Sequence, residues 1–467
     1  MSKSLIVGRK AELKILNQVY ESPEAEFVAI YGRRRIGKTF LVSEFFKDKD
    51  VYFEVTGIKN GRLSKQLFQF AYEFGRCFGS SIEEIPTLKS WAQAFQLLNE
   101  AIEKTAAENG KIVLFFDELP WFAGRKSGFL SALEHFWNRY ASRHPRVILI
   151  VCGSVASWII RRIIYNKGGL HGRLTRTLQL LPFSLAETEA YLSSRQISLN
   201  RKQIAEIYMA IGGIPKYLSH IKRGESAAQN ISALFIPKTG PLYDEFTKLY
   251  QSLFEHYEHH IALVKTLARH SFGLTQTELL KQAGLPSGGT STKIIEELED
   301  TGFISYMAPF NHKKTGGKYR LTDEYSLFYL NKSSKNIWAG QAFELLCLKH
   351  QAQIKKALGI SGIKTQESNW WYLPAKGSDD TGAQIDLVID RSDHCINLCE
   401  MKFYDAPWSM GKEDAAKLRS QKEVFRQHSQ TNKALLTTVI SVYGLKKNMH
   451  SLGVVDSEVT LDDLFSS

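Results

Sequence analysis

Gly32-Arg33-Arg34-Arg35-Ile36-Gly37-Lys38-Thr39 follows a short apolar run at residues 27–31 and precedes a helix-like segment that begins at Phe40. The two glycines let such a loop curl so that backbone N–H groups face a phosphate, and the following helix N-terminus adds a favourable dipole. Strand, glycine loop and helix in this order predict a P-loop, with residues 32–40 as nucleotide contacts. We expect Lys38 to reach the β- and γ-phosphates and Thr39 to coordinate Mg²⁺.

Two more apolar runs place polar residues where a P-loop site needs them. Residues 112–116 contain no polar side chain, which is typical of a parallel strand covered on both faces, and Asp117 and Glu118 follow directly. The first carboxylate suits a Mg²⁺ partner and the second a general base that activates water. Residues 147–152 form a third strand-like run, after which Ser154 could hydrogen-bond the γ-phosphate or the attacking water. These patterns predict an ATPase core that uses ATP and Mg²⁺.

The composition is that of a globular chain with a basic excess. The 467 residues include 60 Lys and Arg against 48 Asp and Glu, for a formal net charge of +12. Such an excess favours a polyanionic partner such as DNA, because contacts with phosphates release counterions. The alternative is that the charge only keeps the chain soluble.

Neither a membrane segment nor a disulfide framework is evident. No apolar run approaches 18 residues, and the N-terminus has no apolar signal core. The five cysteines are an odd set without a CxxC pair, which argues against a zinc ribbon. We therefore expect a cytoplasmic protein with reduced thiols and no membrane partner.

Two segments beside the P-loop region resemble the AAA+/STAND group of P-loop ATPases, specifically the archaeal-type ATPase family that is also widespread in bacteria. Residues 7–13 (VGRKAEL) are similar to the family's G-R-x-x-E-L box, and residues 170–176 (LHGRLTR) are similar to its arginine segment. The resemblance implies that Arg9 lies near the adenine and that subunits associate. It also makes Arg173 the candidate arginine finger, with Arg176 as the second choice.

A helix-patterned region follows the ATPase core. Ser184 and Glu187 are spaced as a capping box at a helix start. Residues 213–215 (GIP) resemble the G-x-P turn of the family's helical lid, which implies that Pro215 lies near the base.

A compact helical unit with a basic hairpin is predicted at about residues 255–330. Residues 261–268 form a first helix, Thr275 and Glu278 form a capping box before a second, and a third runs from about Gly289 to Asp300. Two short strands then pair across a lysine-rich tip, which completes the pattern of a winged helix-turn-helix. The candidate DNA contacts are Thr290, Ser291, Lys293, Lys313, Lys314 and Lys318. The alternative is a winged helix that serves only for protein packing.

Acidic residues and a lysine cluster on a predicted hairpin near the C-terminus. Residues 383–390 alternate as a strand, and residues 395–403 form the return strand, which puts Asp386 opposite Cys399 or Glu400. Glu400 and Lys402 share one face, because strand residues repeat their facing every two positions. Asp386 and Glu400 can hold Mg²⁺, and Lys402 can orient water or pair with a phosphate.

This pattern resembles the PD-(D/E)xK nuclease superfamily, and the whole C-terminal part is similar to the nuclease-like domain of the archaeal-type ATPases. Glu344, on a predicted helix before the hairpin, is the further acid that we expect at the site. One alternative is a surface hairpin with a cross-strand ion pair, and another is a nuclease fold without activity.

Together these features predict an α/β protein with four parts. They are an AAA+-like P-loop ATPase core at 1–174, a helical lid at 175–250, a winged helix-turn-helix at 251–332, and a restriction-endonuclease-like α/β domain at 333–467. The expected function is ATP-controlled, Mg²⁺-dependent DNA cleavage. The alternative is an ATP-switched DNA-binding regulator.

Overall fold

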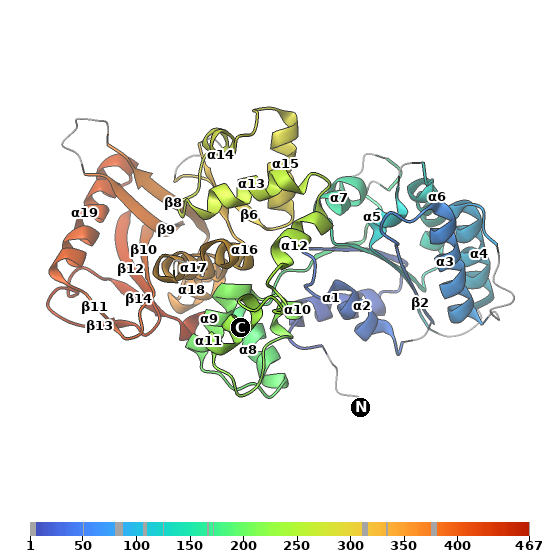
Figure 1. Cartoon of the computed structure of the whole chain (residues 1–467), viewed down its shortest axis with the longest axis horizontal. Helices are drawn as coiled ribbons and strands as arrows, with labels where there is room; N and C mark the ends of the chain where they lie inside the picture. The colour runs from blue at the N-terminus through green and yellow to red at the C-terminus, as the bar shows by residue number, and fades with distance from the viewer. Residues whose placement is uncertain are drawn as a thin grey trace. The chain divides into compact units, whose positions relative to one another are not determined.

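The computed structural model describes most of the chain in two compact units, residues 1–182 and 183–467, and each unit is described by itself (Figure 1). The described residues are 6–49, 51–79, 87–105, 110–124, 126–165, 168–170, 172–310, 316–332, 335–374 and 381–466.

The first unit is built on a sheet of five parallel strands in the order β2-β3-β4-β1-β5. Its elements are α1 (Lys10–Glu21), β1 (Glu26–Tyr31), α2 (Lys38–Phe46), β2 (Val51–Thr56), α3 (Leu63–Phe78), α4 (Trp91–Thr105), β3 (Ile112–Asp117), α5 (Leu119–Phe122), α6 (Phe129–Arg139), η2 (Ala141–Arg143), β4 (Val147–Gly153), α7 (Ala156–Ile159), η3 (Ile160–Ile164) and β5 (Arg176–Gln179). The apolar runs that the sequence predicted as strands are β1, β3 and β4, and they lie next to one another in the sheet.

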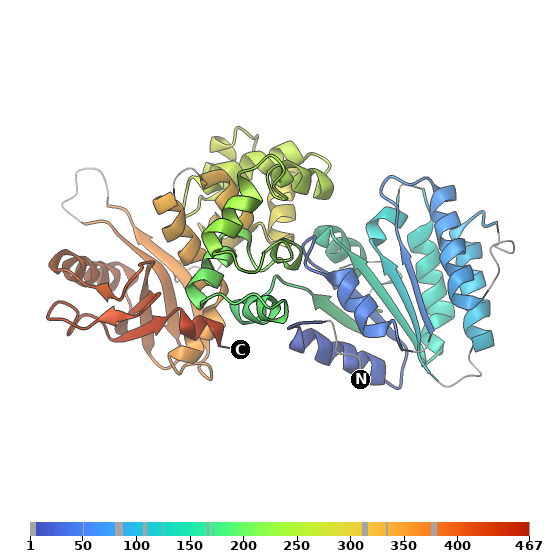
Figure 2. The same ribbon diagram turned by 60° about the horizontal axis from the view of Figure 1, so that its bottom comes forward.

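Helices cover both faces of this sheet, which is why its central strands are almost entirely apolar. Figure 1 and Figure 2 show α1 and α2 on one side and α3, α4 and α6 on the other. An aromatic core fills the second side, where Phe116 of β3 packs among Phe53, Phe70, Phe95 and Phe129. Because the sheet is parallel, the carboxyl ends of β1, β3 and β4 meet at one edge.

The second unit begins with helices. They are α8 (Leu185–Ser194), α9 (Arg201–Ile211), α10 (Pro215–Leu218), α11 (Ala227–Phe235), α12 (Glu245–Leu253), α13 (Tyr257–Ala268), α14 (Gln276–Gln282) and α15 (Gly289–Asp300). Both capping boxes expected from the sequence are present, with Ser184 capping α8 and Thr275 capping α14.

A two-stranded hairpin follows these helices. It consists of β6 (Ile304–Met307) and β7 (Lys318–Leu321), paired antiparallel with Ile304 opposite Leu321, and α16 (Glu324–Asn331) comes next. Three helices and a hairpin therefore occur in the order expected of a winged helix.

The C-terminal part contains a mixed five-stranded sheet in the order β14-β12-β10-β9-β8 and a separate small pairing of β11 with β13. Its elements are α17 (Lys335–Lys349), α18 (Gln351–Ala357), β8 (Thr365–Tyr372), β9 (Ala383–Arg391), β10 (Cys395–Lys402), β11 (Trp408–Ser409), α19 (Lys412–Ser429), β12 (Ala434–Ser441), β13 (Leu445–Lys446), β14 (Ser457–Thr460) and η4 (Asp462–Phe465). Helix α19 connects β10 to the parallel strand β12 and packs on the sheet (Figure 1).

In the described ranges, no helix combines the length and apolar character that crossing a membrane requires.

Candidate nucleotide and metal sites

The P-loop occupies the turn between β1 and α2. Gly32 has a φ of 144°, and a Cβ placed there would lie 2.2 Å from the carbonyl oxygen of Leu180, so only glycine fits. Gly37 caps α2 in the left-handed region with a φ of 88°. The Lys38 Nζ donates to the carbonyl oxygens of Gly32 and Arg33, each at 3.0 Å. The lysine amine is thereby held against the loop, and its contact with the β- and γ-phosphates stays a prediction.

The acidic residues after β3 meet the P-loop helix. The Thr39 Oγ1 donates to Asp117 Oδ2 at 2.7 Å, so the two predicted Mg²⁺ partners are adjacent. A hydroxyl and a carboxylate oxygen are hard donors that suit Mg²⁺, which takes few protein ligands beside phosphate oxygens and water. This arrangement fits a nucleotide bound with Mg²⁺.

Ser154 contacts the second acid rather than standing apart. Its hydroxyl donates to Glu118 Oε1, and its backbone N–H donates to Glu118 Oε2 at 3.2 Å. Glu118 has a φ of 50°, an unfavourable conformation for a residue with a side chain. The end of β4 therefore positions the predicted general base, a role for Ser154 that the sequence did not reveal.

The residues carried over from the family resemblance lie in different settings. Arg9 is buried and donates to the carbonyl oxygens of Leu181 at 2.7 Å and Ile36 at 3.1 Å, so it braces the P-loop. Its contact with adenine stays a prediction. Pro215 begins α10 in the second unit, and its proximity to the base also stays a prediction.

Arg173 and Arg176 are exposed at the start of β5. Arg176 is paired with Val28, and the N–H of Thr175 donates to the carbonyl oxygen of Phe27 at 2.9 Å. Arg173 therefore lies before the amino ends of β1 and β5, whereas the P-loop follows the carboxyl end of β1.

The acids and the lysine that the sequence predicted for a nuclease site lie near one another in the C-terminal sheet. The register of β9 and β10 puts Cys399 opposite Leu387, so by continuation Asp386 faces Glu400, one of the two predicted alternatives. The backbone N–H of Met401 donates to Asp386 Oδ2 at 3.2 Å. Glu400 Oε1 lies 2.8 Å from the Lys402 Nζ and 3.0 Å from the Lys417 Nζ.

The pKa values show that three carboxylates influence one another. Burial, with the nearby charges of Glu344 and Glu400, raises the pKa of Asp386 to about 7. Burial also raises the pKa of Glu344, against the opposing attraction of Arg320. For Glu400 burial acts in the same direction, but Lys402 and Lys417 outweigh it and lower the pKa. The site thus gathers three carboxylates in a place with little water, where three cations already pair with two of them.

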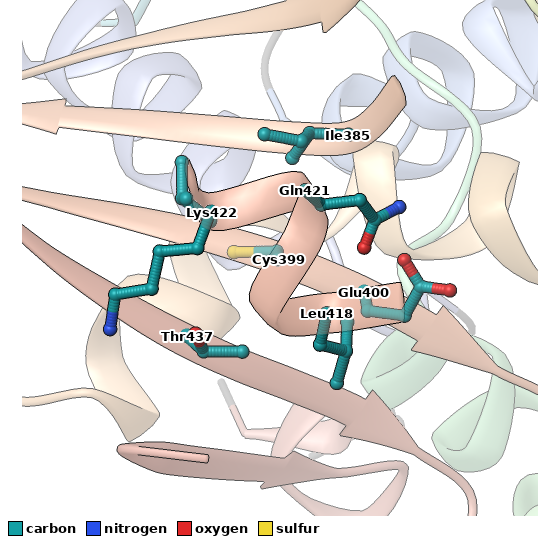
Figure 3. A pocket seen from close by; sticks show the side chains of 8 residues that line it. Ile385, Cys399, Glu400, Leu418, Gln421, Lys422 and Thr437 are labelled. Carbon is teal, nitrogen blue, oxygen red and sulfur yellow. The ribbon is translucent and has the colours of Figure 1, made fainter. Parts of the chain in front are cut away.

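A narrow pocket lies beside Glu400, between α19 and the sheet. Its volume is about 10 Å³, roughly the space of one water molecule. Figure 3 shows Glu400 and Gln421 extending toward the same side, with Lys422 pointing the other way. Gln421 is tied to the sheet by donating to the Gln384 carbonyl oxygen at 2.7 Å.

The fit to a metal ion depends on how many carboxylates are required. In the described part of the chain, no group of three His, Cys, Asp or Glu residues is arranged to hold a metal. Mg²⁺ commonly uses only one or two carboxylates together with water and phosphate oxygens. Asp386 and Glu400, on adjacent strands, fit that donor set.

The predicted DNA contacts are divided by burial. The prediction of Ser291 as a DNA contact is wrong, because its side chain is buried. Its hydroxyl donates to the Pro286 carbonyl oxygen at 2.6 Å and so fixes the start of α15. Thr290 and Lys293 are exposed on that helix. The Lys318 Nζ lies 4.0 Å from the centre of the Trp371 ring, so this predicted DNA contact makes a cation–π interaction with β8. Lys313 and Lys314 lie outside the described residues.

Two charged residues at the nuclease-like site were missed from the sequence. Arg320 on β7 pairs with Glu344 at 3.0 Å, and Lys417 on α19 pairs with Glu400. Lys417 lies 17 positions from its partner and Arg320 lies 24 positions from its own. No local spacing pattern connects residues so far apart, and only the packed structure brings them together.

Comparisons with known proteins agree with the N-terminal site. Residues 6–221 match the family described as an ATPase domain predominantly from Archaea. The chain is 22% identical over 431 residues to the "Uncharacterized protein MJECL04" of Methanocaldococcus jannaschii, covering 86% of this chain and 88% of that protein. It is also 38% identical over 47 residues to the "Uncharacterized ATP-binding protein MJ0423" of the same organism, which is 10% of this chain and 80% of that protein.

One solved structure supports the fold. The "walker-type atpase paby2304" of Pyrococcus abyssi superposes with a TM-score of 0.51 at 17% identity, covering 70% of this chain and 97% of that chain. At this identity the likeness concerns the fold. The P-loop, Asp117, Glu118 and Ser154 all fall within the matched family segment. The N-terminal part of the chain therefore carries an ATPase domain similar to those found predominantly in Archaea.

Proposed function

We propose that the chain hydrolyses ATP at the P-loop and uses its C-terminal sheet to cleave DNA with Mg²⁺. For the first activity, the supporting observation is the contact of Thr39 with Asp117 beside the Glu118–Ser154 pair. Lys38 would bind the phosphates, and Thr39 and Asp117 would hold Mg²⁺, which would neutralise phosphate charge. Glu118 takes the proton of the attacking water, and Ser154 holds its carboxylate in place.

For the second activity, the supporting observation is the convergence of Glu344, Asp386 and Glu400 with Lys402 around one end of the β9–β10 hairpin. Asp386 and Glu400 would hold Mg²⁺, which activates water and stabilises the charge that develops on the phosphate. Lys402 pairs with Glu400 and is placed to contact a phosphate. The basic excess of the chain and the exposed Thr290 and Lys293 support DNA as the substrate.

The test is a plasmid-nicking assay with purified protein and Mg²⁺, run with and without ATP. Wild-type protein should nick DNA, and Asp386→Ala and Lys402→Ala should each abolish cleavage while leaving ATP hydrolysis and DNA binding largely intact. DNA binding depends on contacts between other basic residues and the DNA phosphates, so it should be retained in these variants. Asp390→Ala is the matched control, since Asp390 lies on the same strand but pairs with Lys433. Cleavage by Asp386→Ala equal to that of wild type would point to a contaminant or another site.

A second candidate function is an ATP-switched DNA-binding regulator without nuclease activity. The observation in its favour is that Glu344 and Glu400 are both ion-paired, to Arg320 and to two lysines respectively. On this interpretation the protein binds DNA in a nucleotide-dependent way. If no DNA or RNA is nicked under Mg²⁺ or Mn²⁺, with or without ATP, the regulator interpretation replaces the nuclease one.

A further inference from the structure

A cation from the winged-helix hairpin reaches into the nuclease-like cluster. The Arg320 Nη2 lies 3.0 Å from Glu344 Oε2, and the two side chains are only 8% and 18% exposed. A guanidinium holds a carboxylate in a fixed planar geometry, and water competes weakly with a pair this deeply buried. This contact joins β7 to α17.

The hairpin that carries Arg320 is itself attached to the C-terminal sheet. Lys318, two residues earlier on β7, lies over the Trp371 ring of β8. Pro309 forms an isolated bridge with Asn369, and Phe310 is buried in the core of the C-terminal sheet. These contacts fix the backbone that carries Arg320 beside the C-terminal sheet.

The cations bound to Glu400 are held differently. Lys417 is 57% exposed on α19, and a lysine is a point charge on a flexible stem that can leave when another cation approaches. Lys402 is on the same strand as Glu400 and remains a neighbour of the site. Of the two ion-paired acids, Glu400 can be released to bind a cation, whereas Glu344 is committed to a buried arginine.

We propose that Arg320 withdraws Glu344 from the cation site, so that the nuclease-like site binds a single divalent cation through Asp386 and Glu400. This inference rests on the proposed nuclease function. Arg320 is then a positioning residue, which sets the charge and the number of carboxylates available. The winged-helix hairpin becomes a structural part of the C-terminal site rather than only a candidate DNA contact.

The test is calorimetric titration of the full chain with Mn²⁺, scored as the binding that Asp386→Ala removes. The charge-conserving double variant Arg320→Gln/Glu344→Gln should bind Mn²⁺ within about twofold of wild type. The single variant Arg320→Gln should bind about tenfold more tightly, because a positive charge close to the bound cation is gone. Lys433→Gln, which removes a cation of the same domain that pairs with Asp390 and not with the cluster, should leave Mn²⁺ affinity unchanged.

A loss of tenfold or more in the double variant would show that Glu344 is a ligand and would overturn the inference, as would weaker binding by Arg320→Gln. Thermal unfolding checks that each variant is folded. If the glutamine pair does not fold, Arg320→Met/Glu344→Leu replaces it, since apolar side chains of similar size often substitute for a buried ion pair. Absence of any Asp386-dependent Mn²⁺ binding in wild type would instead contradict the proposed function itself.

Discussion

At the scale of single residues, the nucleotide site depends on unusual backbone conformations next to the reacting groups. Gly32, Arg35 and Glu118 all have positive φ values. For Arg35 and Glu118 such a conformation costs free energy, and the surrounding contacts must compensate for it. The two hydrogen bonds from Ser154 to Glu118 are such contacts, and they fix the carboxylate before nucleotide arrives.

Lys38 and Glu118 lie in different surroundings, and we predict that their substitution affects different steps, nucleotide binding and hydrolysis respectively. Lys38→Ala should abolish tight nucleotide binding, because the amine held against the loop carbonyls is the positive charge for the phosphates. Glu118→Gln should keep binding but lower hydrolysis by about 10²–10⁴, as expected for loss of a general base. Nucleotide affinity and steady-state phosphate release measure the two effects. Unchanged turnover in Glu118→Gln would remove it from the base role.

At the scale of elements, the register of β5 against β1 places Arg173 at the edge of the sheet opposite the P-loop. Arg176 pairs with Val28, so Arg173 precedes the amino end of the sheet, and the P-loop follows Tyr31 at the other end. At about 3.3 Å per residue, β1 separates these edges by roughly 16 Å. The phosphates of the same subunit are therefore an unsuitable target for Arg173.

We predict that Arg173 acts on the nucleotide of a neighbouring subunit. Arg173→Ala alone should lower ATP turnover by about 10³–10⁵, the range for an arginine finger. Mixing it with Glu118→Gln should restore part of the activity, because some interfaces then combine an intact Arg173 with an intact Glu118. Arg176→Ala, treated in the same way, tests the second-choice residue. If both variants fold and associate but no mixture regains activity, Arg173 does not act in trans.

At the scale of the whole molecule, a buried histidine joins the first helix of the second unit to its C-terminal part. The His350 Nε2 accepts the backbone N–H of Leu185 at 3.1 Å, and its Nδ1 lies 2.8 Å from the Leu346 carbonyl oxygen. Burial lowers the pKa of His350 to about 4, so the folded protein keeps this ring neutral. Helices α8 and α17 are consequently linked through one polar side chain inside a single compact unit.

This histidine predicts acid sensitivity of the second unit. The unfolded chain binds a proton near the ordinary histidine pKa of about 6.5, whereas the folded chain does so only near 4. Stability is therefore complete above about pH 6.5 and decreases as the pH falls toward 4, by about 3 kcal/mol in total. His350→Gln should flatten the pH dependence of denaturant unfolding in this window. The same slope in the variant and the wild type would show that other groups cause it.

The sequence by itself determined the features that depend on neighbours along the chain. The apolar runs of β1, β3 and β4, the P-loop glycines, the caps at Ser184 and Thr275, and the facing of Asp386 and Glu400 all follow from local periodicity or a short turn. A tight turn leaves few possible registers, which is why the β9–β10 hairpin could be predicted to within one residue.

Only the tertiary structure decided how distant side chains pair. Arg320 with Glu344, Lys417 with Glu400, and Ser154 with Glu118 join elements whose spacing along the chain carries no signal. Ser291 shows the same limit, because a helix pattern identifies its apolar face but not which polar residue the neighbouring turn will bury. Side-chain partners are set by packing between elements, and that packing is a property of the whole fold.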